Sequence, residues 1–157
     1  MLKGILSSNT CANCRMCCIF EQEDVWEVPL LCTEDAAYIK ENYPDIEMEV
    51  CADGLHFVME FPPNGEDASC PMLSEKGCLL GEHKPFDCKI WPYRLMEKDG
   101  SVWIAVASLC DVVTSQGKEA LLTYYNNVLE CEVKAYYRAN PGAVKRTHGQ
   151  YIFLREV

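Results

Sequence analysis

Residues 11–18 read C-A-N-C-R-M-C-C, which places four thiols, Cys11, Cys14, Cys17 and Cys18, within one short segment. Three of them follow the spacing C-x2-C-x2-C, in which each intervening turn brings the flanking sulfurs to one side of the chain. This spacing is typical of loops that wrap several thiolates around a zinc ion or an iron–sulfur cluster. The segment therefore predicts a metal centre, with zinc and iron–sulfur both open.

More cysteines follow downstream at Cys70, Cys78, Cys88 and Cys110. Because the side chains of adjacent residues diverge, Cys17 and Cys18 are expected to serve different ions, which indicates two centres. One division assigns Cys11, Cys14, Cys17 and Cys70 to the first centre, and Cys18, Cys78, Cys88 and Cys110 to the second. A single centre with spare cysteines is the alternative. The remaining Cys32, Cys51 and Cys131 are expected to be buried packing residues.

The number of cysteines and the expected compartment together indicate whether these thiols bind metal or form disulfides. The chain has 157 residues and 11 cysteines, a high share for an ordinary domain. Its first ten residues lack the apolar stretch of a secretory signal, so we expect a cytoplasmic location, where thiols stay reduced. The odd number of cysteines and the adjacent pair also argue against a complete disulfide set. Metal binding is preferred to disulfides and to free or redox thiols.

The charge restricts the partners. The formal net charge is −10, and thiolate ligands would make it more negative, so binding to nucleic acid or to anionic membranes is not expected. No apolar run approaches the length of a membrane span. A metal ion is the expected ligand, and any protein partner stays open.

The pattern of apolar and turn residues predicts one small α+β domain over residues 1–157, with short strands, cysteine-rich loops and a long C-terminal helix. We expect a helix that starts at an N-cap Thr33 and stops before Pro44. The best helix covers Gln116 to Asn140, with an apolar face of Leu121, Tyr125, Val128, Leu129, Glu132 and Tyr136. The expected strands are Val25–Leu31, a hairpin of Ile46–Val50 with Leu55–Phe61, a hairpin of Tyr93–Glu97 with Val102–Ala107, and Tyr151–Leu154.

Four cysteine blocks in order, C-A-N-C-R-M-C-C, S-C-P-M-L, G-C-L-L and K-P-F-D-C-K-I-W-P-Y, resemble the YkgJ-like CxxCxxCC cysteine-cluster family of zinc- or iron-chelating proteins. The resemblance covers residues 11–18 and 70–94. It implies a metal or cluster, and as ligands Cys11, Cys14, Cys17, Cys18, Cys70, Cys78 and Cys88. Lys84 and Lys89 replace the family's usual arginines, which keeps the charge but loses bidentate geometry, and Leu80 stands where an aromatic residue is common.

The expected function is therefore a metal-binding protein that chelates zinc or an iron–sulfur centre through clustered cysteines. The alternative is a redox or group-transfer, methyltransferase-like enzyme, since a related cysteine cluster occurs in flagellin lysine methylases. No Ser-His-Asp set, P-loop or H-E-x-x-H motif is present, so no catalytic residue is assigned. His83 and Asp87 are expected to have surface or loop roles rather than to bind metal or act as a base.

Overall fold

The computed structural model describes residues 2, 5–6, 10, 13–146 and 150–157. It divides the chain into two compact units, one of Ser8–Cys88 and the other of Met1–Ser7 with Lys89–Val157. Helices and short strands alternate in both, which confirms the expected α+β class. Each unit is described by itself below. No helix in the described ranges has the length and apolarity that a membrane crossing needs.

The Ser8–Cys88 unit contains short elements joined by loops. Its helices are η1 (Met16–Cys18), η2 (Gln22–Glu27), α2 (Thr33–Asn42), η3 (Gly81–His83) and the start of α3 (Phe86–Ile90). Its strands are β1 (Ile19–Phe20), β2 (Met48–Cys51), β3 (Gly54–Phe57), β4 (Ala68–Ser69), β5 (Leu73–Ser74) and β6 (Gly77–Cys78). They form three antiparallel pairs, β1–β4, β2–β3 and β5–β6, so the predicted hairpin on either side of Ala52–Gly54 is confirmed.

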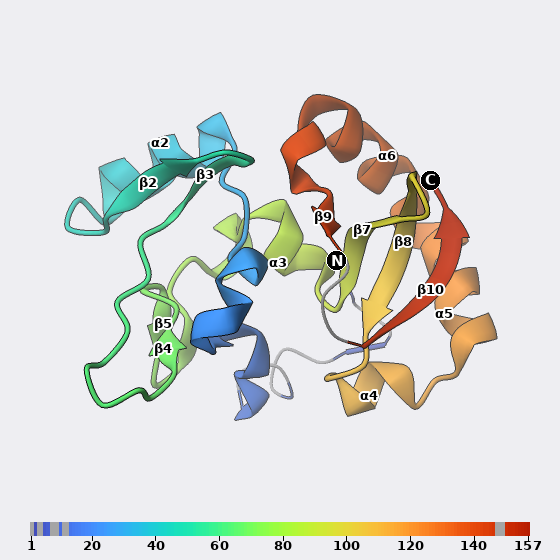
Figure 1. The fold of residues 1–157 in the computed structure, drawn as a ribbon, viewed down its shortest axis with the longest axis horizontal. Coiled ribbons are helices and arrows are strands. Elements are labelled where there is room, and N and C mark those ends of the chain that lie inside the picture. Colours follow the sequence, from blue (N-terminus) through green and yellow to red (C-terminus); the bar gives the residue numbers. More distant parts are fainter. Residues whose placement is uncertain (1, 3–4, 7–9, 11–12, 147–149) are drawn as a thin grey trace. The chain divides into compact units, whose positions relative to one another are not determined.

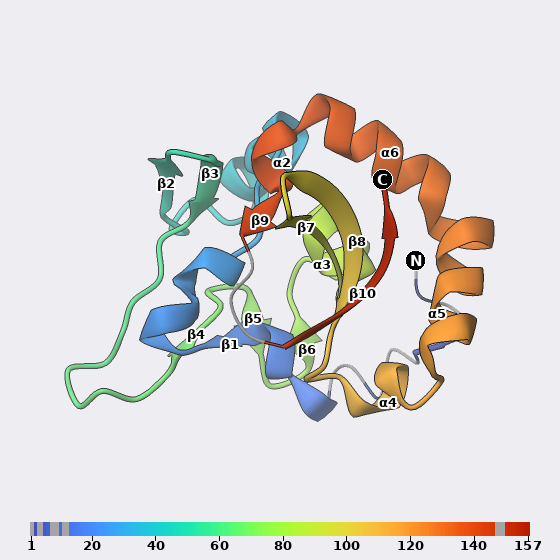
Figure 2. The same cartoon turned by 45° about the vertical axis from the view of Figure 1, so that its right-hand side comes forward.

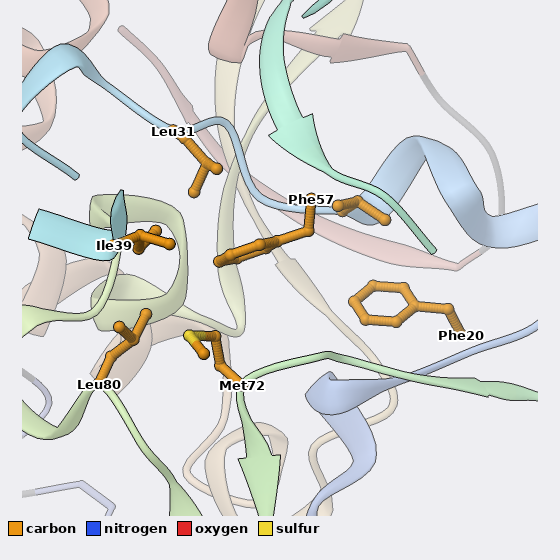
Figure 3. Packing of buried hydrophobic residues seen from close by; sticks show 7 residues of the cluster. Phe20, Leu31, Ile39, Phe57, Met72 and Leu80 are labelled. Atoms are coloured by element: carbon orange, nitrogen blue, oxygen red, sulfur yellow. The ribbon is translucent and has the colours of Figure 1, made fainter. Parts of the chain in front are cut away.

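A hydrophobic cluster holds these short pairs together. Figure 3 shows the Phe57 ring at its centre, with side chains from β1, α2 and the segment around Met72 pointing toward it. The buried members are Phe20, Val28, Leu31, Ile39, Phe57, Met72 and Leu80. Both Cys70 and Cys78 pack against this cluster. The second cysteine segment is therefore part of the core rather than a loose surface loop.

The expected strand Val25–Leu31 is wrong. Residues Gln22–Glu27 form the 3-10 helix η2. In the segment after it, Pro29, Leu30 and Leu31 each make a hydrogen bond to a different residue elsewhere in the unit. His56 Nδ1 donates to the Pro29 carbonyl (3.1 Å), Leu30 N–H donates to the buried Asp87 carboxylate (3.1 Å), and Leu31 N–H donates to Leu55 O (2.8 Å). Because consecutive residues are buried here, the segment cannot alternate between a core face and a solvent face as a half-buried strand does.

Helix α2 begins one residue earlier than expected, with Cys32 rather than Thr33 as its N-cap. Cys32 N–H donates to the Asp35 carboxylate (2.9 Å), and the Cys32 sulfur receives the Asp35 backbone N–H in return. This is a capping box in which sulfur takes the place of a hydroxyl. The helix ends before Pro44, as predicted.

The second unit is built on a four-stranded sheet with the order β10-β8-β7-β9. Its strands are β7 (Tyr93–Lys98), β8 (Ser101–Ala107), β9 (Lys145–Arg146) and β10 (Tyr151–Glu156), and its short helices are α4 (Asp111–Thr114) and η5 (Pro141–Ala143). The turn between β7 and β8 has positive φ at Asp99 (53°) and Gly100 (79°), as a two-residue hairpin turn requires. The predicted hairpin and the predicted last strand are both confirmed (Figure 1).

The predicted C-terminal helix is confirmed as a continuous run of α5 (Lys118–Tyr124), η4 (Tyr125–Leu129) and α6 (Glu130–Ala139). It curves past the sheet, with α5 next to β10 (Figure 2). The middle segment η4 is a π-helix, which widens the turn. Every fourth residue is buried across it: Leu121, Tyr125, Leu129 and Val133. The expectation that Val128 and Glu132 belong to the apolar face is wrong, since both are exposed.

Candidate metal centre

The first cysteine loop turns sharply at Arg15. This residue has a left-handed backbone (φ 58°, ψ 0°), after which Met16–Cys18 form one turn of 3-10 helix. The Cys18 N–H closes the turn on Arg15 O at 2.8 Å. The turn brings the Sγ atoms of Cys17 and Cys18 to 3.7 Å from each other. The expectation that these adjacent side chains diverge is therefore wrong.

That sulfur–sulfur distance fits one tetrahedral ion. A zinc–thiolate bond is about 2.3 Å long, so two sulfurs on one tetrahedral zinc lie about 3.8 Å apart. Cys17 and Cys18, at 3.7 Å, are at the distance of one edge of such a tetrahedron. The pair can act as a chelate toward one ion, and it does not require two centres.

The strand pair β1–β4 brings the second cysteine segment beside the first. Ile19 is opposite Ser69 in this pair, and the next hydrogen bond joins Cys70 N–H to Cys18 O at 2.8 Å. Cys70 then starts a tight turn, closed by Leu73 N–H on Cys70 O. The turn leads into the β5–β6 hairpin, where Cys78 is opposite Leu73.

Arg15 joins these two segments through its side chain. Its guanidinium donates to the carbonyl of Glu75, which lies in the turn of the β5–β6 hairpin, 60 residues away in sequence. The same turn is stiffened by the Ser74 hydroxyl, which donates to Gly77 O at 2.7 Å. Arg15 therefore shapes the first loop through its backbone and fastens it to the second through its side chain.

The Cys70 thiol interacts electrostatically with two other thiols of this unit. Burial, with a smaller contribution from the charges of Cys78 and Cys17, raises the pKa of the Cys70 thiol to about 11. The Met72 backbone N–H opposes this shift because it stabilises the thiolate. Without a cation, Cys70 is a protonated thiol at neutral pH. A divalent ion among these sulfurs would favour the thiolate, as metals do for their thiol ligands.

The structure places the expected ligands as follows. The sulfurs of Cys17 and Cys18 lie side by side, the backbone of Cys70 is bonded to that of Cys18, and Cys78 lies on the hairpin that follows Cys70. Cys14 is exposed just before Arg15, and Cys88 is half-buried on α3. Cys11 lies outside the described residues, and Cys110 is buried at the start of α4 in the other unit. Within the described ranges, no three Cys, His, Asp or Glu side chains stand in an arrangement ready to hold a metal ion.

The cysteines outside the blocks have other places. All ten described cysteines are thiols, with no disulfide among them. Cys32 caps α2, whereas Cys51 and Cys131 are exposed. The expectation that all three are buried packing residues is therefore wrong for Cys51 and Cys131.

Other polar side chains near the blocks serve the fold. The His83 ring stacks on Tyr38, with 4.0 Å between ring centroids. Asp87, just before Cys88, accepts the Leu30 N–H in a buried site. The exposed His83 agrees with its expected surface role, whereas the expectation that Asp87 is a loop residue is wrong, since Asp87 lies buried in α3. Sequence reasoning assigned no partner to His56, whose ring joins Pro29 O to the Asp53 carboxylate (3.0 Å). Nothing in its sequence surroundings indicated that bridge.

The linings of two surface hollows can be compared with these thiols. One is an open groove of about 560 Å³ along α5 and η4, lined partly by Tyr124 and Val128. The other, of about 200 Å³, is lined by polar residues that include Glu21, Glu66 and Asp67. Neither lining contains a cysteine or a histidine. The clustered thiols are therefore the stronger candidate site.

No family model, curated protein or solved structure matches this chain. The resemblance to the CxxCxxCC cysteine-cluster family stays a prediction that rests on the four sequence blocks.

Proposed function

We propose that this chain is a metal-binding protein in which Cys17, Cys18, Cys70 and Cys78 hold one ion. One observation carries the proposal: the Sγ atoms of Cys17 and Cys18 are 3.7 Å apart, and the half-buried Cys70 of a remote segment is joined to Cys18 by a backbone hydrogen bond. Sulfur ligands select soft or borderline metals, which leaves zinc and iron as the candidates. The final ligand geometry forms on binding, since coordination and local folding are commonly coupled.

Zinc is the preferred ion. The Cys17–Cys18 distance matches two thiolates on a single tetrahedral ion, whereas the cysteines of a four-iron cluster each bind a different iron. A set of four protein thiolates leaves no open coordination position, so the zinc would be structural rather than hydrolytic. It would tie the first loop and the β5–β6 hairpin to the hydrophobic cluster. The iron–sulfur centre is retained as the alternative outcome of the test.

The proposal also concerns compartment and partners. A site of reduced thiols needs a reducing compartment, so we propose a cytoplasmic location. The net charge of −10 supports the inference that the protein binds neither nucleic acid nor anionic membranes.

The test is metal and sulfide analysis of protein purified without oxygen. We expect about one zinc per chain, no acid-labile sulfide and no visible colour. A brown protein with a broad visible band and matching iron and sulfide would replace zinc with a cluster. Absence of both metals from a folded chain, together with no zinc uptake on titration, would refute the proposal.

Single cysteine variants test the ligand set. Cys17→Ser and Cys70→Ser should each lower zinc content and thermal stability together, because each removes a thiolate from the ion. Cys131→Ser is the matched control, since its thiol is exposed on α6, and it should keep full zinc content. Equal zinc loss in all three variants would contradict the assignment.

A further inference from the structure

We propose that the Cys17–Cys18 pair is also a chelating dithiol that captures trivalent arsenicals, a class of ligand distinct from the metal ion proposed above. The proposal needs only two thiols, and the structure places two at chelating distance. It does not require the proposed zinc site to exist.

The 3-10 turn after Arg15 turns both sulfurs to the same side, with Sγ atoms 3.7 Å apart. A trivalent arsenic atom bonds sulfur in a pyramidal arrangement, with S–As–S angles below the tetrahedral value. Two of its sulfur ligands therefore lie somewhat closer together than two on zinc, and small side-chain rotations at Cys17 and Cys18 bring the sulfurs to that separation. Both residues are half-buried, so they retain a path to solvent.

The same two thiols do not readily form a disulfide with each other. The Cys17–Cys18 peptide bond is trans, so the two Cα atoms are about 3.8 Å apart. Disulfides join Cα atoms that are usually about 4.4–6.8 Å apart, so closing one between these neighbours requires backbone strain. The pair can therefore bind one further atom through both sulfurs, whereas a disulfide between Cys17 and Cys18 is disfavoured. A dithiol of this kind stays available for ligand capture.

Apolar residues flank the pair. Met16 and Ile19 have 48% and 41% of their surfaces exposed. They offer apolar surface to a methyl or phenyl group carried by the arsenic. The backbone N–H of Cys70 donates to Cys18 O at 2.8 Å. Cys70 therefore offers a third sulfur in the adjacent segment for inorganic arsenite, which has three exchangeable oxygens.

The capture step is a condensation without electron transfer. An organoarsonous acid, R–As(OH)2, loses both As–O bonds and gains As–S bonds to Cys17 and Cys18. The two thiol protons leave with the two hydroxyl groups as two water molecules. Arsenic stays in the +3 state and both sulfurs keep their oxidation state, so no oxidant or reductant is needed.

The experiment uses the full chain, freed of metal by a chelator and kept without oxygen, with one equivalent of phenylarsonous acid. We expect one phenylarsenic adduct by native mass spectrometry and a fall from 11 titratable thiols to nine. Peptide mapping of the unsubstituted protein should place the adduct on residues 17 and 18. Mapping to another pair of cysteines, or no adduct, would overturn the proposal.

Variants give the matched comparison. Cys17→Ser and Cys18→Ser should each weaken phenylarsonous acid binding about 100-fold or more, because a single thiol loses the chelate advantage. Cys51→Ser, which alters an exposed thiol in the same unit, should bind as the parent does. Unchanged binding in either chelate variant would overturn the proposal. Because the protein is metal-free, a failure of zinc binding would leave this result unaffected.

Discussion

The substitution Gly54→Ala tests how tightly the cysteine-bearing unit is packed. Gly54 starts β3 at φ +148°, in a region that residues with a side chain rarely adopt. A Cβ atom added there would lie 2.2 Å from Leu30 Cδ1, whereas ordinary contacts start at 3.4 Å. The Leu30 side chain would have to retreat by more than 1 Å.

Retreat is difficult because the backbone on both sides of Leu30 is held. The carbonyl of Pro29 is bound by His56, the Leu30 N–H by Asp87 and the Leu31 N–H by Leu55. Leu30 itself is only 5% exposed. Overpacking a core in this way costs about 1–3 kcal/mol, and the unusual φ costs a further ~1–3 kcal/mol. Restricting the unfolded chain returns about 0.4–1 kcal/mol, so the middle of these ranges gives an expected loss of about 3 kcal/mol in the free energy of unfolding.

Urea unfolding followed by circular dichroism measures this loss, with Gly65→Ala as the control. Gly65 also has a positive φ (+78°), but a Cβ atom there meets nothing within 4 Å. The control therefore measures the loss in the free energy of unfolding that comes from the positive φ without a steric contact, which we expect to be about 1 kcal/mol. If the two variants lost equal stability, the packing of Leu30 against Gly54 would not be the cause, and the reasoning would fail.

Three further predictions use other parts of the chain. Arg15→Gly keeps the left-handed turn but removes the hydrogen bond from the side chain to the hairpin carbonyl, so zinc affinity in a competition titration should fall about 10–100-fold. Arg15→Lys should recover part of that affinity. Equal zinc affinity in the parent and both variants would refute this role of Arg15. Burial raises the pKa of Tyr93 and brings that of Tyr125 to about 12, from an ordinary value of 10.0. A tyrosine whose pKa is higher in the folded than in the unfolded chain stabilises the fold until the pH passes the unfolded-state pKa, so the free energy of unfolding should fall as pH rises above about 10. The share of tyrosinate absorbance that comes from Tyr93 and Tyr125 should grow only as the chain unfolds. Cys32→Ala should lower the free energy of unfolding, measured in urea, by about 1 kcal/mol because it removes the cap of α2. Cys32→Ser should lower it by less, because a hydroxyl can take the place of the sulfur. A larger loss in Cys32→Ser than in Cys32→Ala would contradict the capping box.

Local sequence patterns predicted those helices and hairpins that are determined by neighbouring residues in the chain. The Asp99–Gly100 turn, the hairpin around Asp53 and the long C-terminal helix all follow from turn chemistry or periodicity, and all are confirmed. The predictions failed where distant residues decide. The chain around Leu30 looks like a strand, but it is held by side chains from β3 and α3, which no local pattern reveals. The π-helical turn likewise moved Val128 out of the core.

For the candidate site, the sequence by itself determined which side chains are present: an acidic, thiol-rich chain with ligand-like spacing in residues 11–18 and further cysteines from residue 70 onward. Only the tertiary structure decided the grouping, because it depends on the backbone turn at Arg15 and on the pairing of β1 with β4. Together these place Cys17 next to Cys18 and bring Cys70 alongside. Spacing along a chain limits which sulfurs can meet, but the direction of each side chain follows from dihedral angles and long-range hydrogen bonds that the folded unit sets.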